Sequence, residues 1–382
     1  MKKQRPRILL VTSNLPPLVG GMERMMLEVA EGLSKHADLW VIGPRGCSKH
    51  LPSAVQVREI SHSLGGFVSQ SLLRGASLCR RQRFDIILGG SGLTGPCLLA
   101  LQRLYRTPTA IFLHGLDLVA DNWIYQSLFV PTICRANLVF ANSRNTARLA
   151  ICRGVAERCI TVINPGCSPP DNSAHDRIIK FRQQHGIADG PLMLFVGRMT
   201  KRKGLSHFIA KGLPSILQKL PTSSLLVVGD TPDHAFKQSD EKQAVMQNIE
   251  RLSPAHRERV QFLGQLEDDE LNTAYAMADV HIFPVLEIPG DVEGFGMVVI
   301  EAASYGTPTV AFDAGGVADA IGETAGVLVP PNNYHAMTES IVSILQKPRD
   351  WRENCLRHAS RYYWPEFHRI LKVRLSHEFL QR

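Results

Sequence analysis

Residues 293–301 read Glu-Gly-Phe-Gly-Met-Val-Val-Ile-Glu, so two carboxylates stand eight positions apart around a glycine-rich turn. Gly294 and Gly296 predict that the turn opens a helix, and amides at a helix start bind phosphate readily. Glu301 then lies one or two turns inside the helix, where a carboxylate can bind both hydroxyls of a ribose. Helix carboxylates usually pair with a neighbour, but an acid flanked by Val-Ile and Ala-Ala is unfavourable to bury without a purpose. We therefore interpret this stretch as part of a nucleotide-binding site.

Short apolar runs alternate with helical patterns on both sides of this stretch. Such alternation predicts parallel sheets with right-handed crossovers. We expect strands at Arg7–Val11, Leu39–Ile42, Asp85–Leu88, Thr109–Leu113, Leu138–Ala141, Leu192–Val196, Ser224–Val228, Val260–Leu263, Val280–Phe283 and Pro308–Phe312. We expect helices at Met22–Leu33, Ser69–Cys79, Pro96–Leu104, Leu205–Leu220, Asp268–Met277 and Gly296–Tyr305.

Turn-forming residues interrupt this rhythm at 164–172. A chain of 382 residues also exceeds the size at which one hydrophobic core keeps growing. The sequence therefore predicts an α/β fold of two doubly wound domains that face each other. Ligands of such sheets bind at the carboxyl ends of the strands, so we expect a cleft between the domains.

Composition places the chain among ordinary globular proteins, with 44% hydrophobic and 20% charged residues. The eight cysteines are scattered and form no C-x-x-C pair, which favours reduced thiols over a disulfide framework or a zinc site. The apolar run after the basic start is too short for a signal peptide, and none is long enough for a membrane span. We expect a cytoplasmic protein.

Positive charge is concentrated in the first half of the chain. Residues 1–185 hold 23 Lys and Arg against 11 Asp and Glu, whereas the remainder holds 20 against 24. The basic clusters at 80–83 and 103–106 lack the interleaved aromatic residues of a single-strand nucleic-acid binder. Basic runs are often merely solvated, but this asymmetry favours an anionic membrane surface as a partner over nucleic acid.

Two loops between a strand and a helix carry further candidates. Gly20 and Gly21 precede the first helix, where small residues allow a phosphate to approach the helix start, although a tight turn alone would also use them. Gly197, Arg198 and Lys203 hold the same position in the second half of the chain. An arginine and a lysine placed there favour a diphosphate-binding loop over a basic loop that is merely solvated.

His114 and Asp117 follow the strand expected at 109–113, where side chains of a doubly wound sheet reach its ligand. A structural histidine is nearly as consistent with that pattern. Residues 90–95 match the dinucleotide pattern G-x-G-x-x-G. They come late in the first domain, so we interpret them as a tight loop. No D-x-D occurs, and the nearest approach is Asp291-Val-Glu293, so the metal-chelating type of transferase is disfavoured.

As a set, these motifs resemble retaining glycosyltransferase family 4, which has the GT-B fold of two Rossmann-like domains. The resemblance runs from the Gly-Gly loop through His114, Asn142-Ser143 and 196–204 to the E-x7-E element and Ala314-Gly-Gly316. It implies that Arg198 and Lys203 hold the donor diphosphate, Glu293 contacts the sugar and Glu301 the ribose. It also implies four catalytic residues, His114, Arg198, Lys203 and Glu293. The implied donor-binding set is Gly20, Gly21, Gly197, Gly294, Phe295, Gly296, Met297 and Glu301, with Asp117 on the acceptor side and no metal.

The resemblance implies domains at 1–185, with a linker from about 165, and at 186–360, and a helix at 361–382 that returns to the first domain. Two departures from the family pattern concern the linker, Pro165-Gly-Cys-Ser168, which lacks the usual acid, and Gly229-Asp-Thr231, which lacks a second glycine.

The expected function is retaining transfer of a hexose from a nucleotide-sugar to a glycan or lipid-linked acceptor in envelope polysaccharide synthesis, without a metal. Residues 289–296 look like the matching segment of envelope mannosyltransferases, which implies GDP-mannose as the donor. A UDP-sugar donor or a nucleotide-sugar epimerase remains the alternative. A dinucleotide-dependent oxidoreductase and a non-catalytic nucleotide-binding protein are more distant ones.

Overall fold

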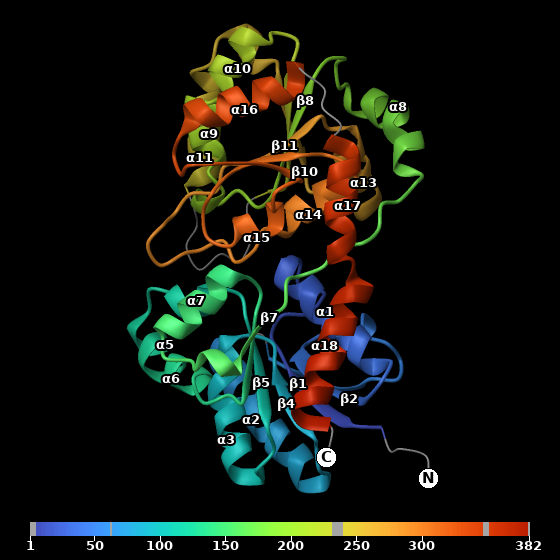
Figure 1. The fold of residues 1–382 in the computed structure, drawn as a ribbon, viewed down its shortest axis with the longest axis vertical. Coiled ribbons are helices and arrows are strands. Elements are labelled where there is room, and N and C mark those ends of the chain that lie inside the picture. Colours follow the sequence, from blue (N-terminus) through green and yellow to red (C-terminus); the bar gives the residue numbers. More distant parts are fainter. Residues whose placement is uncertain (1–4, 62, 231–239, 347–350, 381–382) are drawn as a thin grey trace. The chain divides into compact units, whose positions relative to one another are not determined.

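The computed structural model describes residues 5–61, 63–230, 240–346 and 351–380. Within these residues no helix combines the length and the apolar character needed to cross a membrane. The chain divides into two units, each with its own parallel sheet (Figure 1). Unit 1 comprises Met1–Gly166, Pro289–Phe295 and Trp364–Arg382, and unit 2 comprises Cys167–Ile288 and Gly296–Tyr363. The expected α/β class with two parallel-sheet domains is confirmed.

Unit 1 is built on a seven-stranded sheet with the order β3-β2-β1-β4-β5-β6-β7, in which neighbouring strands run parallel. The central strands are apolar and buried, because helices cover both faces of a doubly wound sheet. The strands are β1 (Arg7–Val11), β2 (Asp38–Pro44), β3 (Gln56–Ile60), β4 (Ile86–Gly89), β5 (Thr109–Leu113), β6 (Leu138–Ala141) and β7 (Ile160–Val162).

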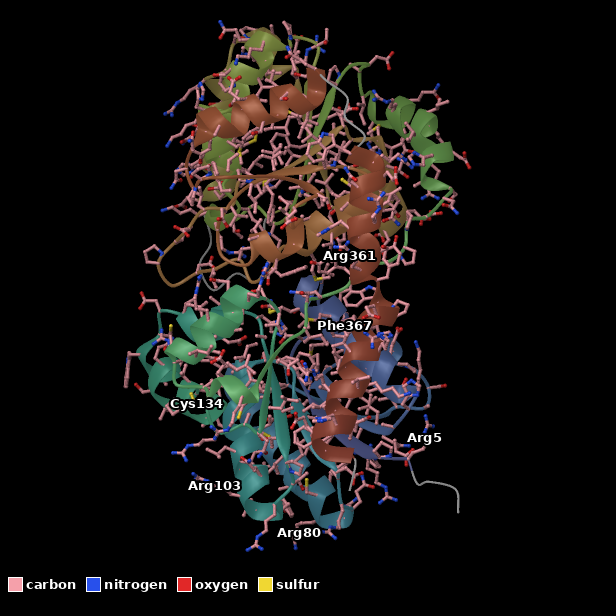
Figure 2. All side chains as sticks on the ribbon, viewed as in Figure 1. Arg5, Arg80, Arg103, Cys134, Arg361 and Phe367 are labelled. Atoms are coloured by element: carbon pink, nitrogen blue, oxygen red, sulfur yellow. The ribbon has the colours of Figure 1, made fainter. Side chains whose placement is uncertain are left out.

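The helices of unit 1 connect these strands, and one more comes from the end of the chain. They are α1 (Gly21–Ser34), α2 (Leu64–Arg81), α3 (Gly95–Tyr105), α4 (Leu116–Val119), α5 (Trp123–Leu128), α6 (Val130–Ile133), α7 (Arg144–Cys152) and α18 (Trp364–Leu375). Helix α18 packs against α1, and His368 lies so close to Gly32 that a Cβ there would meet its ring at 2.6 Å. Phe367 of this helix, which is labelled in Figure 2, is buried.

Unit 2 is built on a six-stranded sheet with the order β10-β9-β8-β11-β12-β13, and its neighbouring strands also run parallel. Its strands are β8 (Leu192–Val196), β9 (Ser224–Val228), β10 (Val260–Gly264), β11 (Val280–Phe283), β12 (Thr309–Phe312) and β13 (Gly326–Val329). Its helices are α8 (Ala174–His185), α9 (Leu205–Lys211), α10 (Leu213–Lys219), α11 (Glu241–Glu250), α12 (Pro254–Arg257), α13 (Asp268–Met277), α14 (Met297–Ser304), α15 (Val317–Ile321), α16 (Tyr334–Gln346) and α17 (Trp351–Ala359).

The helix expected at Leu205–Leu220 is two helices in the structure. Gly212 separates α9 from α10, and Pro214 stands in the first turn of α10. Proline lacks an amide hydrogen and fits the start of a helix better than its interior, so the chain restarts there.

The unit boundaries differ from the expected domain boundaries in two places. Residues 167–185, expected with the first domain, lie in unit 2, because α8 packs against α13 and Arg177 donates from Nε to the Thr273 hydroxyl at 3.1 Å. Residues 289–295, expected with the second domain, lie in unit 1. The final helix α18 is part of unit 1, as the resemblance implied for the end of the chain. Thr231, which stands where the family pattern has a second glycine, falls outside the described residues.

Candidate active site

The loop between β1 and α1 places Gly20 and Gly21 at the start of a 14-residue helix. Gly20 is the N-cap of α1 and Gly21 is its exposed first residue. Since a glycine cap offers no side chain to the first amides, these amides can bind a ligand. Asn14 donates from Nδ2 to Glu23 Oε1 at 3.0 Å and so ties the loop to the first turn of the helix.

His114 directly follows β5 and is 7% exposed. Its Nε2 lies 2.8 Å from the carbonyl oxygen of Gly90. A carbonyl only accepts, so Nε2 carries a hydrogen, and Nδ1 is then the nitrogen that can accept whenever the ring carries a single hydrogen. The histidine is therefore held in one tautomer by the loop after the neighbouring strand β4.

Asp117 organises the backbone around His114. Its Oδ2 accepts from the amide of His114 at 2.8 Å and its Oδ1 accepts from the amide of Gly92 at 2.9 Å. Burial raises the pKa of Tyr125, and the charge of Asp117 and a hydrogen bond to it raise that pKa further. Both oxygens of the Asp117 carboxylate thus hold backbone amides in place. The sequence predicted Asp117 near the acceptor but did not predict this positioning role.

The segment that carries Glu293 and Gly294 packs onto the end of β5 within unit 1. A Cβ added at Gly294 would lie 2.1 Å from the carbonyl oxygen of His114 and 2.6 Å from Asn142 Nδ2. Gly115, at φ +96°, faces the same segment, since its own Cβ would come within 3.0 Å of Val292 Cγ1. The structure therefore brings the backbone beside Glu293 together with His114, two residues 179 positions apart in the sequence.

Neighbouring side chains of the same unit occupy the space beside the glycines of residues 90–95. A Cβ at Gly90 would meet Thr12 Oγ1 at 2.2 Å, and one at Gly95 would meet Thr132 Oγ1 at 2.3 Å. Gly92 is similarly close to Tyr125. These contacts agree with the interpretation of a tight loop, because the space above the glycines is already occupied.

In unit 2, Lys203 and Arg198 lie in the loop that follows β8. Arg198 is exposed, and Lys203 is half-buried with its Nζ 4.5 Å from the centre of the Phe283 ring. A lysine over an aromatic face is held by the ring's negative potential. Gly204 stands at φ +69°, and a Cβ there would lie 2.0 Å from the carbonyl oxygen of Pro284, so the close approach of this loop to β11 requires glycine. Gly197 precedes Arg198, and a Cβ there would contact the Lys203 side chain at 3.6 Å.

The helix start and the second carboxylate of the E-x7-E element also belong to unit 2. Gly296, at φ +93°, caps α14, and Met297 is its first residue. A Cβ at Gly296 would lie 2.9 Å from Phe283 Cε1. Glu301 is in the second turn of the helix, and its Oε2 accepts from the hydroxyl of Tyr275 at 3.1 Å. Phe295, the last residue of unit 1 in this element, is 2% exposed.

Three buried aromatic residues, which we call the aromatic row, connect Lys203 with Glu301: Tyr275, His281 and Phe283. The Tyr275 and His281 ring centres are 6.3 Å apart, and those of His281 and Phe283 are 5.8 Å apart. Burial, and to a smaller extent the charge of Lys203, lowers the pKa of His281 to about 3, so this histidine is neutral. The row was not predicted from the sequence, although a histidine within the apolar strand Val280–Phe283 was a possible signal for it.

Two family models match separate parts of this chain and together span most of it. The model described as "Glycosyltransferase Family 4" matches residues 19–169, and "Glycosyl transferases group 1" matches residues 190–347. An uncharacterized glycosyltransferase of Methanocaldococcus jannaschii is 24% identical over 387 residues, 94% of each chain. A GDP-mannose-dependent alpha-(1-6)-phosphatidylinositol monomannoside mannosyltransferase of Mycobacterium tuberculosis is 24% identical over 89% of each chain. Its Mycolicibacterium smegmatis counterpart is 30% identical over 47% of this chain and 44% of its own.

Solved structures share the fold across the whole chain. Anabaena HepE in complex with UDP superposes with a TM-score of 0.77 and 21% identity, covering 97% of this chain and 100% of its own. Sucrose-phosphate synthase from Thermosynechococcus elongatus superposes with a TM-score of 0.80 and 19% identity, covering 99% of this chain and 100% of its own.

Proposed function

Since this chain belongs to glycosyltransferase family 4 and has the GT-B fold, we propose that it transfers a hexose from a nucleotide-sugar to a glycan or lipid-linked acceptor, with retention at the anomeric carbon and without a metal. The observation that carries the proposal is the arrangement in unit 2. Arg198 and Lys203 follow one strand of a parallel sheet, and the aromatic row connects Lys203 with the carboxylate of Glu301. Two cations suit a diphosphate and a carboxylate suits a ribose diol, which are the two polar parts of a nucleotide-sugar.

The proposed chemistry needs a stable leaving group. Cleavage of the bond between sugar and phosphate develops positive charge on the sugar and negative charge on the diphosphate. Arg198, Lys203 and the first amides of α14 would stabilise that negative charge. A leaving phosphate oxygen would then take the proton of the acceptor hydroxyl as the new bond forms on the same face.

In unit 1, His114 and Glu293 are assigned to the sugar, with Nδ1 of His114 as an acceptor for a sugar hydroxyl. The amides of Gly20 and Gly21 would add a second phosphate contact. Asp117 acts through His114, because its carboxylate holds the backbone at the end of β5.

GDP-mannose is the proposed donor, and an envelope glycan or its lipid-linked precursor is the proposed acceptor class. Support comes from the mannosyltransferase relatives, whose names specify that donor, and from the segment at 289–296. We propose a reducing, cytoplasmic location because no disulfide joins any two of the eight cysteines, all of which lie in the described ranges.

A donor panel tests this proposal. GDP-mannose, UDP-glucose, UDP-galactose, NADH and NADPH are compared in thermal shift and in slow hydrolysis, each with and without EDTA. We expect one nucleotide-sugar to stabilise the chain and to be hydrolysed at the same rate with EDTA, and NMR of the transfer product to show the anomeric configuration of the donor. Stabilisation by a dinucleotide alone contradicts the class of enzyme, an effect of EDTA contradicts metal independence, and an inverted product contradicts retention.

Tyr275→Phe tests the positioning of Glu301. The change removes the hydroxyl that donates to Glu301 Oε2, so we expect KM for the donor to rise about three- to tenfold while kcat falls less than about twofold. Tyr334→Phe is the matched control, because it removes another buried tyrosine hydroxyl of unit 2, one with no hydrogen-bond partner among the described residues. Equal changes of KM in the two variants would show that Tyr275 has only a structural role.

A further inference from the structure

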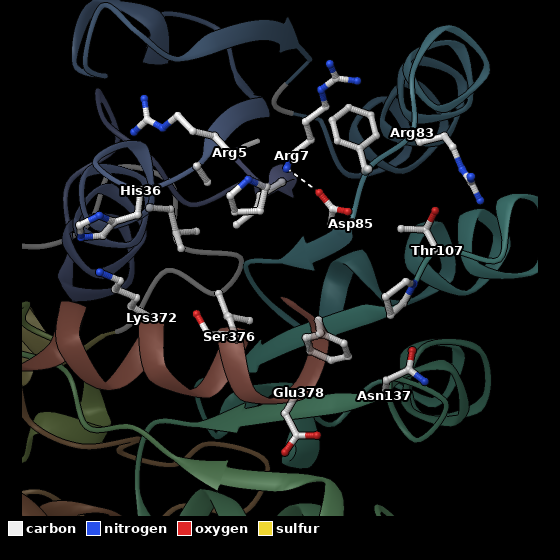
Figure 3. Close-up of a pocket in the computed structure, with 18 of the residues that line it drawn as sticks. Arg5, Arg7, His36, Arg83, Asp85, Thr107, Asn137, Lys372, Ser376 and Glu378 are labelled. Carbon is white, nitrogen blue, oxygen red and sulfur yellow. Dashed lines mark hydrogen bonds between the residues drawn. The ribbon is translucent and has the colours of Figure 1, made fainter. Parts of the chain in front are cut away.

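Unit 1 contains a cavity at the amino ends of its strands, at the opposite end of the sheet from His114 (Figure 3). The cavity has a volume of about 1580 Å³. It is lined by Arg7, the first residue of β1, and by residues that directly precede strands, among them Asp85 before β4 and Asn137 before β6. In a parallel sheet the amino ends of all strands lie at the same end of the sheet. This cavity is therefore separate from the loops after β1 and β5, which lie at the carboxyl ends. It contains none of the predicted site residues.

Positive charge dominates the wall of this cavity. Five cations line it, Arg5, Arg7, Arg83, Arg106 and Lys372, against two acids, Asp85 and Glu378. One oxygen of Asp85 already accepts from the backbone amide of Arg7 at 2.7 Å. Figure 3 shows Lys372 on α18 beside His36, and Arg83 on the other side of the cavity.

Helix ends explain only part of this charge. Helices α1, α2 and α3 end near the amino ends of the strands that follow them, and their last carbonyls favour cations there. Arg5 donates from Nη2 to the carbonyl oxygen of Ser34, the last residue of α1. Arg83, Arg106 and Lys372 have no ion-pair or hydrogen-bond partner for their side chains among the described residues. Three of the five cations of this cavity thus have no partner for their charge in the part of the chain that the structure describes.

The pKa of His36 is affected by the same positive charges. Burial lowers its pKa, and the charges of Lys372, Arg5, Lys35 and His368 lower it further. Apolar side chains such as Phe84, Leu375 and Phe379 complete the wall. A ligand that fits both features carries phosphate and an organic portion that contacts these apolar groups.

We propose that this cavity binds a phosphoester, either as a free molecule or as the headgroup of a membrane lipid. The site is independent of the proposed donor site, since none of the residues proposed to bind the donor lines this cavity. Phosphate oxygens would accept from Arg83, in the loop before β4, and from Lys372, on α18, both of which line the cavity.

The test compares two pairs of substitutions in the full chain. Arg83→Gln/Lys372→Gln removes two cations of the cavity, and Arg45→Gln/Arg148→Gln removes two exposed arginines of unit 1 that do not line it. Both pairs are made in a Lys203→Gln background, so that the diphosphate site of unit 2 contributes less to binding. Calorimetric titration with sodium pyrophosphate at low ionic strength and sedimentation with phosphatidylcholine vesicles, with and without phosphatidic acid, are the two arms.

We expect the cavity pair to weaken binding about tenfold in at least one arm, and the control pair to weaken it less than about twofold. Loss in the pyrophosphate arm shows that the cavity binds phosphate groups of a molecule free in solution, and loss in the vesicle arm alone assigns a lipid headgroup. The proposal is overturned if neither probe binds, or if the two pairs weaken binding equally, which would mean attraction to net charge alone. Neither readout depends on glycosyl transfer, so the result stands apart from the proposed function.

Discussion

Lys203→Ala is expected to lower kcat/KM for the nucleotide-sugar by about 100- to 1000-fold, the usual effect of removing one preorganised group that stabilises a leaving charge. The ammonium group of Lys203 is held over the Phe283 ring, in the loop that Gly204 packs against Pro284. Little reorganisation is then needed when charge develops on the diphosphate. Steady-state kinetics with the donor identified by the panel would measure the effect.

Lys201→Ala is the control for this substitution. Lys201 is exposed and lies two positions earlier in the same basic loop. Its substitution by alanine therefore removes the same charge from the same loop. We expect a loss of less than about threefold, because an exposed charge is screened by solvent and salt. If both variants lost activity equally, Lys203 would act only through the general charge of the loop.

Gly294→Ala is expected to reduce turnover by at least about 100-fold, as a small misplacement near the reacting groups can do. The new methyl group would overlap the carbonyl oxygen of His114, a backbone atom that Asp117 holds in place from the adjacent amide. The segment with Glu293 must therefore move away from His114. We also expect the free energy of unfolding to fall by about 1–3 kcal/mol, as in other overpacked sites.

The control for the glycine substitution is Gly65→Ala. Gly65 lies in α2 of the same unit, and a Cβ there has no atom within 4 Å among the described residues. Activity should stay close to that of the unchanged chain, and the free energy of unfolding should stay the same or rise by up to about 1 kcal/mol, because alanine favours a helix more than glycine does. Nucleotide binding separates loss of fold from loss of geometry. Lys203 and Glu301 belong to unit 2, so Gly294→Ala should still bind the nucleoside diphosphate. If this variant kept full activity, the contact between the Glu293 segment and His114 would have no role in turnover.

Most strands were predictable from the sequence, and those that were missed share one physical property. The missed strands β3, β7 and β13 are each the last strand at an edge of a sheet. An edge strand has one neighbour and more solvent exposure, so it need not be a continuous apolar run. In β3, for example, one of its five residues is buried. Periodicity detects burial, and burial is weakest at the edges.

The candidate site was predictable where it depends on local sequence. Glycines and charged residues between a strand and a helix identified the loops at Gly20 and Lys203 and the start of α14. The aromatic row and the place of the Glu293 segment in unit 1 were not predictable, because they depend on contacts between residues far apart in the sequence. Tyr275 and Glu301 are 26 positions apart, and Gly294 lies against a strand end 180 positions earlier.

The packing of α18 against α1 has a consequence for synthesis on the ribosome. The first strand of unit 1 is translated at the beginning, but four buried side chains of this unit, Trp364, Phe367, Leu371 and Leu375, are translated at the end. Unit 2 lies in between and can complete its sheet while unit 1 still exposes the face of α1 that α18 covers. The part of the protein that is made first is therefore finished last, and a chain interrupted shortly before residue 364 would leave that apolar surface open to chaperones and proteases.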